Sequence, residues 1–371
     1  MRTAIATSFT PTLDSGRARR TYGLVRALAA TGPVDLVYGA FGSDRPDPAY
    51  EEIAGLRLHR VERPGTAARL PAYLRARLSG VPGDFARGIW PALASRTAEL
   101  ATAGSTRVIA EGPVAAAALL PLAGRRPAIY DAHNLESAFR HRLDEAGMSL
   151  AALERFERLL LERFEESWMV SPADMEGAAA LAPAARLRLV PNVVDVAAIE
   201  PVPPRDGQRV VLFVADLSYE PNRGALRFLL EEAMPSLWER AADVRLVVAG
   251  KGSEEIRPAD ARIEPSGFVP DLRDLYLAAG CVAVPLLEGG GSPLKFVEAL
   301  AYGMPVIATR RAAAGLAVRD GEHCLLAEDE DEFAAALVRV LRDGAPDVAR
   351  HGRELAAERY SIEALSRLLA S

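Results

Sequence analysis

A glycine-rich turn that leads directly into a helix is the feature of this sequence best suited to chemistry. The run from Glu288 to Pro305, EGGGSPLKFVEALAYGMP, follows an apolar strand-like segment that begins at Cys281. Unpaired backbone N–H groups and the helix dipole make such a turn an anion site, best suited to phosphate. A lysine in the first helical turn opposes the dipole, so a bound anion would explain the position of Lys295.

Glu298 lies one turn after Lys295, on the same face of the predicted helix. Its carboxylate is an acceptor pair suited to the two hydroxyls of a ribose, and a diphosphate beside a ribose suggests a nucleotide-sugar. Alternatively, the glycines serve only the turn, and Lys295 and Glu298 form a solvated pair worth a few tenths of a kcal/mol. The position at the carboxyl end of a parallel strand favours the ligand site, because open α/β sheets bind ligands there.

A second strand–glycine–helix turn lies near the N-terminus, where Gly16 precedes a basic helix that begins with Arg17. Asp14 or Ser15 could simply cap this helix. A matching loop in the second half of the chain favours a functional role, in which the backbone near Gly16 faces the same ligand.

Three polar residues, Asp131, His133 and Asn134, end the strand-like segment AIYDAHN. A histidine there could be a satisfied structural residue, but polar residues at a strand end suit a ligand cleft better than a core. We therefore expect His133 to be the best-placed donor or proton handler of the first domain.

Two loops in the second half follow predicted strands. In SYEPN we expect Asn222 to cap the next helix and Arg223 to lie beside the cleft. Phe268 and Val269 lie at a strand end, where backbone groups could read the edge of a nucleobase; a plain loop is the alternative.

Composition excludes several classes of protein. The net charge of −6 over 371 residues gives no support for nucleic-acid binding. Cys281 and Cys324 lie in apolar runs and indicate reduced thiols in a cytoplasmic protein, while the five scattered histidines predict no metal site. The apolar run at the N-terminus is too short for a signal peptide or a membrane span.

The alternation of short apolar runs with amphipathic ones predicts an α/β protein with two Rossmann-like domains facing across a cleft. The proline-rich segment 201–207 is the expected linker. We expect an acceptor-binding domain over 1–200, which the C-terminal helix at about 355–371 rejoins, and a nucleotide-sugar-binding domain over 201–354. The arginine-rich stretch from Arg69, RLPAYLRARLSG, could lie on a membrane surface. Because it is short and interrupted by Pro71, a solvated helix beside the acceptor cleft is favoured, and any membrane contact is expected to be at most peripheral.

Several motifs in this order together resemble the retaining glycosyltransferases of family 4, which have the GT-B fold. The resemblance covers nearly the whole chain and is strongest from Val210 to Leu326. The motifs are SGRARRTYGLVRAL, YDAHNLES, VPNVVD, FVADLSYEPN, GFVPDL, GGGSPLKFVEALAYGMPVIAT and GLAVRDGEHCLLA.

The resemblance implies a hexosyltransferase that moves a sugar from a nucleotide-diphosphate-sugar co-substrate, with retention and without a metal or other cofactor. It implies catalytic roles for Lys295 and His133. The implied donor-binding residues are Glu298, Gly290, Gly291, Ser292, Pro293, Leu294, Phe268, Val269, Gly16, Arg17, Asn222 and Arg223. Further sugar contacts are expected at Glu288, Asn134 and Asp131.

Two departures from the family pattern concern the donor site. Many members have a glutamate where this chain has Gly290, and Glu288 is the nearest substitute. Many also carry two cations after the first strand of the second domain, where this chain has Asp216 and Pro221. Lys295 would then be the main diphosphate cation, with Arg223 or Arg17 as helpers.

Two other functions stay open. A nucleotide-sugar epimerase of similar fold would need clustered acids and histidines, which the sequence does not reveal. A non-catalytic, nucleotide-binding partner protein is supported by the loss of the glutamate at Gly290. The sequence does not specify the donor nucleotide. It does not specify the acceptor either, which could be a cell-envelope glycan or a small natural product.

Overall fold

A computed structural model describes residues 1–63, 65–101, 106–138, 149–203, 207–288 and 291–370. The chain forms two compact units, of which unit 1 comprises Met1–Pro191 and Leu365–Ser371, and unit 2 comprises Asn192–Ala364. The domain boundaries expected at residues 200 and 354 stay a prediction.

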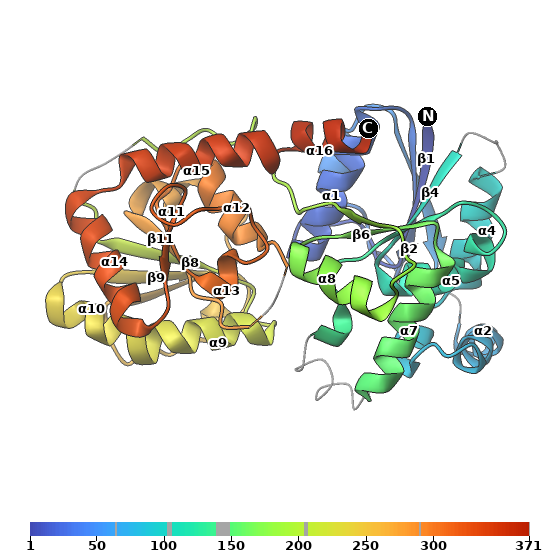
Figure 1. The fold of residues 1–371 in the computed structure, drawn as a ribbon, viewed down its shortest axis with the longest axis horizontal. Helices are drawn as coiled ribbons and strands as arrows, with labels where there is room; N and C mark the ends of the chain where they lie inside the picture. Colours follow the sequence, from blue (N-terminus) through green and yellow to red (C-terminus); the bar gives the residue numbers. More distant parts are fainter. Residues whose placement is uncertain (64, 102–105, 139–148, 204–206, 289–290, 371) are drawn as a thin grey trace. The chain divides into compact units, whose positions relative to one another are not determined.

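Unit 1 is built on a seven-stranded parallel sheet with the strand order β3-β2-β1-β4-β5-β6-β7 (Figure 1). Its strands are β1 (Arg2–Thr7), β2 (Val34–Ala40), β3 (Leu56–Glu62), β4 (Thr106–Glu111), β5 (Ile129–Asp131), β6 (Glu166–Met169) and β7 (Leu187–Leu189). The alternation of these strands with helices agrees with the predicted α/β class.

The helices of unit 1 pack on this sheet or on one another. They are α1 (Gly16–Ala29), α2 (Thr66–Leu78), α3 (Gly83–Arg87), α4 (Pro91–Leu100), α5 (Gly112–Ala123), α7 (Leu150–Arg163) and α8 (Pro172–Leu181), with single turns η1 (Pro48–Tyr50) and η2 (Glu136–Ala138). In α7 the buried residues Leu153, Phe156 and Leu160 recur at helical spacing. The hydroxyl of Ser149 caps this helix by accepting a hydrogen bond of 3.1 Å from the Ala152 N–H.

Unit 2 repeats this plan with a six-stranded parallel sheet in the order β10-β9-β8-β11-β12-β13. The strands are β8 (Val210–Val214), β9 (Arg245–Ala249), β10 (Ile263–Gly267), β11 (Cys281–Val284), β12 (Val306–Thr309) and β13 (Leu325–Ala327). The helical segments are α9 (Glu220–Phe228), η3 (Leu229–Ala233), α10 (Met234–Arg240), η4 (Ser253–Glu255), α11 (Arg273–Ala278), α12 (Leu294–Ala301), α13 (Arg310–Ala313), α14 (Glu330–Asp343), α15 (Pro346–Arg359) and α16 (Ile362–Ala370).

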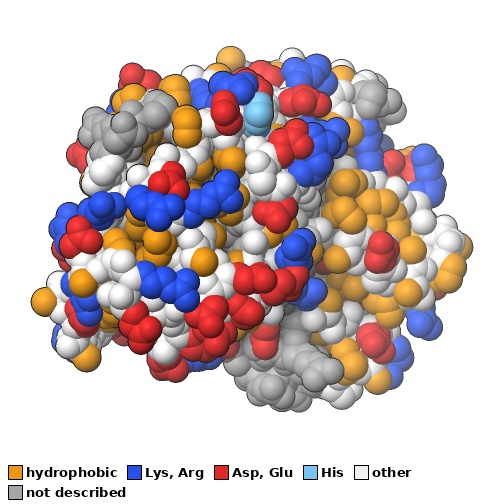
Figure 2. Space-filling model, turned by 60° about the vertical axis from the view of Figure 1, so that its left-hand side comes forward, with side chains coloured by type: hydrophobic (Ala, Val, Ile, Leu, Met, Phe, Trp, Pro, Cys, Tyr) orange, Lys and Arg blue, Asp and Glu red, His pale blue; other side chains and the backbone are white. Residues whose placement is uncertain are grey.

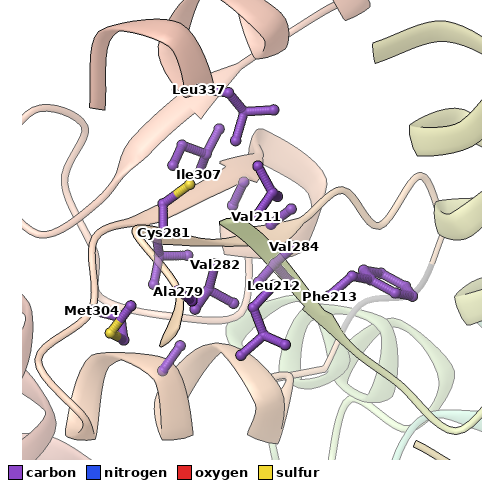
Figure 3. Close-up of a cluster of buried hydrophobic side chains, with 14 of the residues drawn as sticks. Val211, Leu212, Phe213, Ala279, Cys281, Val282, Val284, Met304, Ile307 and Leu337 are labelled. Atoms are coloured by element: carbon purple, nitrogen blue, oxygen red, sulfur yellow. The ribbon is translucent and has the colours of Figure 1, made fainter. Parts of the chain in front are cut away.

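The core of unit 2 surrounds its two central strands, β8 and β11. Figure 3 shows side chains of both strands packed with residues from neighbouring helices. Val211, Leu212 and Phe213 of β8 have no exposed surface, and Cys281 is likewise a buried free thiol. Strands that are apolar on both faces are typical of a sheet covered by helices on both sides.

Each sheet contains one point at which the strand order reverses. In unit 1 it lies between β1 and β4, and in unit 2 between β8 and β11. The connections on the two sides of such a point leave toward opposite faces, which opens a crevice at the carboxyl ends of the strands. These two places are therefore where the fold itself favours a ligand site.

The last helix begins in unit 2 and ends in unit 1. Its second half, from Leu365, belongs to unit 1, where the Arg107 side chain donates to the Leu369 carbonyl at 3.4 Å and Arg188 donates to the Leu368 carbonyl. This return confirms the predicted C-terminal crossing, and the two parallel sheets confirm the predicted fold class. No helix in the described parts of the chain is long and apolar enough to span a bilayer.

One glycine holds the loop after β8 against the end of β9. Gly250 has φ of +120°, and a Cβ atom built on it would lie 2.1 Å from the Ala215 carbonyl oxygen. The two segments are joined by a 2.8 Å hydrogen bond from the Leu217 N–H to the Lys251 carbonyl. Only glycine therefore allows this close approach, which fixes the path of the chain into Asp216.

We predict that Gly250→Ala lowers the free energy of unfolding by about 3 kcal/mol or more, because it combines left-handed strain with a backbone clash. Gly321→Ala is the matched control, since Gly321 has φ of +73° but open space around it. That variant should lose only about 1 kcal/mol. Denaturant unfolding measures both, and equal losses would contradict the role of the close approach.

Candidate functional site

Lys295 lies in the first turn of α12, next to the point where the order of the unit 2 strands reverses. Its Nζ donates a hydrogen bond of 2.6 Å to Oδ1 of Asn222 and lies 5.3 Å from the centre of the Phe213 ring. The helix begins after Pro293, which has an extended conformation and provides no side-chain cap. A cation is thus held where the N–H groups of a helix also attract negative charge.

Burial lowers the pKa of Lys295 to about 7, although the Asp216 carboxylate opposes this shift. Two arginines of unit 2 differ from Lys295 in having a carboxylate as their partner: Arg240 pairs with Asp331 at 3.2 Å, and Arg245 pairs with Glu264 at 2.7 Å. Acidic and basic side chains are interspersed on the surface shown in Figure 2. Within the described ranges no ion pair joins Lys295 to a carboxylate, so its direct partner is the neutral amide of Asn222.

The expectation that Asn222 caps a helix is wrong. Tyr219 occupies the cap position of α9, and Asn222 lies inside the first turn, almost fully buried. Its amide nitrogen donates to the Asp216 carbonyl at 2.7 Å, which turns its oxygen toward Lys295. Asp216 in turn accepts from the N–H and hydroxyl of Ser218 at 2.9 and 2.6 Å. Asn222 therefore positions the ammonium group.

The glycine-rich turn itself is partly described. Gly290 lies outside the described residues, Gly291 is half-buried and Glu288 is exposed. Ser292 is buried, where its hydroxyl accepts a 3.1 Å bond from the Asn192 N–H and its carbonyl accepts a 2.7 Å bond from the Asn192 amide. Asn192 therefore anchors the turn.

The other predicted residues of unit 2 fall into two groups. Pro293, Leu294 and Glu298 are partly buried on or beside α12, close in sequence to Lys295. Farther along the sheet, after β10, Phe268 is 55% exposed and Val269 packs on the core.

Arg223 is occupied by neighbours in its own helix and the loop before it. It pairs with Glu220 and donates to the carbonyls of Leu217 and Ser218 at 3.0 and 3.2 Å. These bonds fix the loop after β8, so the structure gives Arg223 a local structural role.

Unit 1 places a polar row at the carboxyl ends of three adjacent strands. Parallel pairing aligns Thr7 of β1 with Glu111 of β4, and Glu111 with Asp131 of β5. All three side chains have no exposed surface. The row lies at the strand-order reversal of this sheet, where a ligand crevice is expected.

Glu111 is the centre of this cluster. It accepts hydrogen bonds from the hydroxyls of Thr7 at 2.5 Å and Thr21 at 2.9 Å, contacts Nε2 of His133, and pairs with Arg17 at 3.7 Å. Burial alone would raise the pKa of Glu111, but the nearby His133 and Arg17 and the bond from Thr7 lower it to about 2. A buried carboxylate is thus held in its charged form.

Asp131 is neutralised separately. Arg20 binds it through two nitrogens and donates a third bond of 3.1 Å to the Val190 carbonyl. Arg17, by contrast, is partly exposed and lies over the Phe9 ring at 4.2 Å. The predicted Asp131 is therefore a structural partner of Arg20 in this state.

The predicted turn at Gly16 begins α1, and Ser15 caps it by accepting a 3.2 Å bond from the Ala18 N–H. The capping alternative is therefore present at this turn, while the expected phosphate contact stays a prediction. Asn134 is half-buried beside His133, whose side chain is 10% exposed.

Sequence reasoning missed Glu111, and with it the clustering of acids and histidine. Its signal was a charged residue at the end of the apolar run RVIAE, followed by Gly112. Gly112 has φ of +79°, and a Cβ there would lie 2.9 Å from Cε1 of His133. Glycine is thus required for the imidazole to reach the carboxylate.

The side-chain ligand atoms of Glu111, Asp131 and His133 lie within 4.8 Å of one another, which is close enough to hold a metal ion. This contradicts the expectation that acids and histidines are not clustered. Arg17 and Arg20 already supply positive charge to the two carboxylates, and a divalent cation would have to compete with both. The cluster is therefore better suited to holding the His133 imidazole in place than to binding a metal ion.

Two Rossmann-like parallel units and a final helix that returns to the first unit define the GT-B fold. Among solved structures, sucrose-phosphate synthase from Thermosynechococcus elongatus matches with a TM-score of 0.71 at 19% identity, over 100% of this chain and 97% of that one. Anabaena Alr3699/HepE, solved in complex with UDP and glucose, matches with a TM-score of 0.68 at 14% identity, over 100% and 98%.

Residues 208–343 match the family described as "Glycosyl transferases group 1". The phosphatidyl-myo-inositol mannosyltransferase of Mycobacterium leprae is 32% identical over 172 residues, which are 42% of this chain and 44% of that protein. An uncharacterized 44.6 kDa protein in the cps region of Klebsiella pneumoniae is 26% identical over 40% and 42%. The match thus spans less than half the length of these relatives.

We predict that Glu111→Gln lowers the free energy of unfolding by about 3 kcal/mol near neutral pH, because the pKa of Glu111 falls from 4.5 to about 2 on folding. A lowered carboxyl pKa stabilises the fold above pH 4.5, and this contribution is lost as the pH falls toward 2. The difference from the native chain should therefore shrink over that window, as measured by denaturant unfolding.

Glu99→Gln is the matched control, because Glu99 is an exposed partner of Arg96 at 2.9 Å. Its loss should stay below about 1 kcal/mol. A Glu111→Gln difference that persists unchanged down to pH 2 would contradict the charged state of this carboxyl.

Proposed function

We propose that this chain is a retaining, metal-independent glycosyltransferase of the hexosyltransferase type, which transfers a sugar from a nucleotide-diphosphate-sugar to an acceptor. The observation that carries the proposal is the enclosed ammonium group of Lys295, held at a helix N-terminus with a neutral amide as its partner. Burial disfavours the charged form of Lys295, and a bound diphosphate would supply the negative charge that stabilises the ammonium group. The family match over 208–343 and a structural relative solved with UDP and glucose support the same ligand class.

In the proposed donor complex, Lys295 and the backbone from Gly290 to Leu294 bind the diphosphate. Glu298 binds the ribose hydroxyls, and Phe268 with Val269 borders the base. The exposed Phe268 ring suits this role, because an aromatic face in solvent can stack on a base. Glu288 is the carboxylate that we propose approaches the sugar.

The residues proposed for unit 1 are Gly16, Arg17 and His133. Arg17 is partly exposed beside Gly16, so its guanidinium can serve a phosphate while remaining near Glu111. Nε2 of His133 contacts Glu111, and we propose that the imidazole faces the sugar or the acceptor. Asn134 lies beside it as a further polar group.

The proposed mechanism is transfer on one face of the sugar. The bond from the anomeric carbon to the diphosphate oxygen breaks, and the acceptor oxygen forms its new bond on the same face. The leaving phosphate oxygen takes the acceptor proton, so no protein base is required. Lys295 and the N–H groups of α12 stabilise the departing charge, and such electrostatic stabilisation commonly contributes more to catalysis than any other effect.

Three further features accompany the proposed activity. The arginine pairs of the Glu111 cluster favour a reaction without metal, so EDTA should leave turnover unchanged. The proposed acceptor is a cell-envelope glycan or a small natural product. We place the protein in the cytoplasm, in agreement with its two reduced, buried cysteines.

The cluster of Glu111, Asp131 and His133 favours a second candidate, a nucleotide-sugar epimerase. A third is a nucleotide-binding partner protein without activity. Thermal shift with UDP, GDP, dTDP and ADP separates these, since a ligand stabilises by RT ln(1 + [L]/Kd). The absence of any shift would favour a role without nucleotide chemistry, and a changed free sugar nucleotide without an acceptor product would identify an epimerase.

We predict that Lys295→Ala lowers turnover at least about 100-fold, by analogy with the loss of one preorganised donor to a developing anion. Arg245→Ala is the control, because Arg245 begins β9 toward one edge of the same sheet and pairs with Glu264. Mass spectrometry of product formed from the nucleotide-sugar that binds best measures both. Near-normal turnover of Lys295→Ala would exclude the proposed mechanism.

The pKa of Lys295, about 7, also predicts how nucleotide affinity depends on pH. Below pH 7 the ammonium is already charged, but above it a diphosphate can bind only with uptake of a proton. Affinity should therefore fall as the pH rises from 7 to 9, by up to about tenfold per pH unit. Titration calorimetry in buffers of different ionisation enthalpy measures this uptake. Lys295→Met should abolish it, and an equal pH dependence in that variant would contradict the assignment.

A further inference from the structure

Helix α2 presents an apolar stripe to solvent. Leu70, Leu74 and Leu78 follow at intervals of four residues and are 55%, 51% and 90% exposed. The opposite face of α2 packs on unit 1 through the buried Ala76 and the half-buried Tyr73. Single exposed leucines are ordinary, but three at helical spacing form a continuous stripe on one side of a helix that is already packed on the other.

The segment around this stripe has one sign of charge. From residue 63 to residue 83 the sequence contains Arg63, Arg69, Arg75 and Arg77 and lacks both Asp and Glu. In the whole chain acidic residues outnumber basic ones by 50 to 44, so this segment is locally opposite to the rest. Arg75 and Arg77 are exposed on α2, at positions adjacent to the leucines.

The flanking arginines are partly fixed by the fold. Arg77 donates to the Val81 carbonyl at 2.9 Å, and Arg63 lies 4.8 Å above the ring of Phe41, which is itself 41% exposed. Within unit 1, α2 lies at the outer side of the helix layer (Figure 1). The leucines and the cations are thus presented together from a packed element.

We propose that α2 is a docking surface for an anionic lipid bilayer. Leucines inserted at the boundary of headgroups and acyl chains would lose their contact with water, while Arg75 and Arg77 reach the anionic headgroups above them. This arrangement is typical of helices that lie on a membrane, and attraction to anionic lipid adds to the apolar contribution. The sequence alone favoured a solvated helix, but it could not show that the leucines point outward.

A membrane fits the stripe better than a protein groove does. The stripe is apolar along its centre, is flanked by Arg75 and Arg77, and lacks the carboxylates that would give a protein partner a fixed register. A second copy of the chain would bring the same basic flank against this one, with like charges opposed. The bilayer contact does not depend on the proposed sugar transfer, because it requires no nucleotide.

Vesicle flotation with the full chain tests the proposal. The native chain should float with vesicles of equal phosphatidylglycerol and phosphatidylcholine and stay behind with pure phosphatidylcholine. The triple variant Leu70→Ser, Leu74→Ser, Leu78→Ser should bind about 100-fold more weakly, since each exposed leucine contributes part of its transfer free energy. Arg75→Gln with Arg77→Gln should reduce binding about 30-fold at low salt.

The matched control is Leu150→Ser, which removes a leucine of 44% exposure at the start of α7 and should float like the native chain. As a second measurement, Leu74→Trp should be quenched by lipids with brominated acyl chains, above the signal of the native tryptophans. The proposal is overturned if the native chain does not float with anionic vesicles or floats equally with neutral ones. It is also overturned if the triple variant floats normally, or if light scattering without lipid shows a dimer that this variant dissociates.

Discussion

Parallel pairing of a central strand with two neighbours is the constraint on which both functional clusters depend. In unit 1 it brings Thr7, Glu111 and Asp131 into one row, although they are far apart in sequence. In unit 2 it brings the loop after β8 beside the turn before α12, so that Asn222 can meet Lys295. A register slip of one residue between β4 and either of its neighbours would separate the side chains of this row.

The two clusters hold charge in opposite ways. Glu111 is a buried anion that receives hydroxyls, an imidazole and a guanidinium, so its charge is already balanced by the fold. Lys295 is a cation whose closest partner is neutral. The charge of Glu111 therefore needs no ligand to balance it. The charged form of Lys295, by contrast, is stabilised most by an anionic ligand.

Much of the fold could be predicted because apolar runs and turn residues act locally. The alternation of apolar and amphipathic runs predicted parallel sheets covered by helices, and the family resemblance predicted the GT-B fold. The cluster around Glu111 could not be predicted, since it depends on the register of β1, β4 and β5 and on the positive φ of Gly112. Asn222 was assigned to a cap because the sequence does not reveal that α9 starts earlier, after Tyr219. The outward direction of the α2 leucines likewise depends on which face packs.

The final helix has a consequence for the order of events during synthesis. Unit 1 is made of Met1–Pro191 and Leu365–Ser371, so all of unit 2 is translated between its two parts. The bonds of Arg107 and Arg188 to the carbonyls of Leu369 and Leu368 can form only after that. During synthesis, unit 1 therefore lacks its last helical turn until translation ends, and these two guanidinium groups lack their bonds to it until then. Unit 1 can therefore complete its fold only after unit 2 has been synthesised.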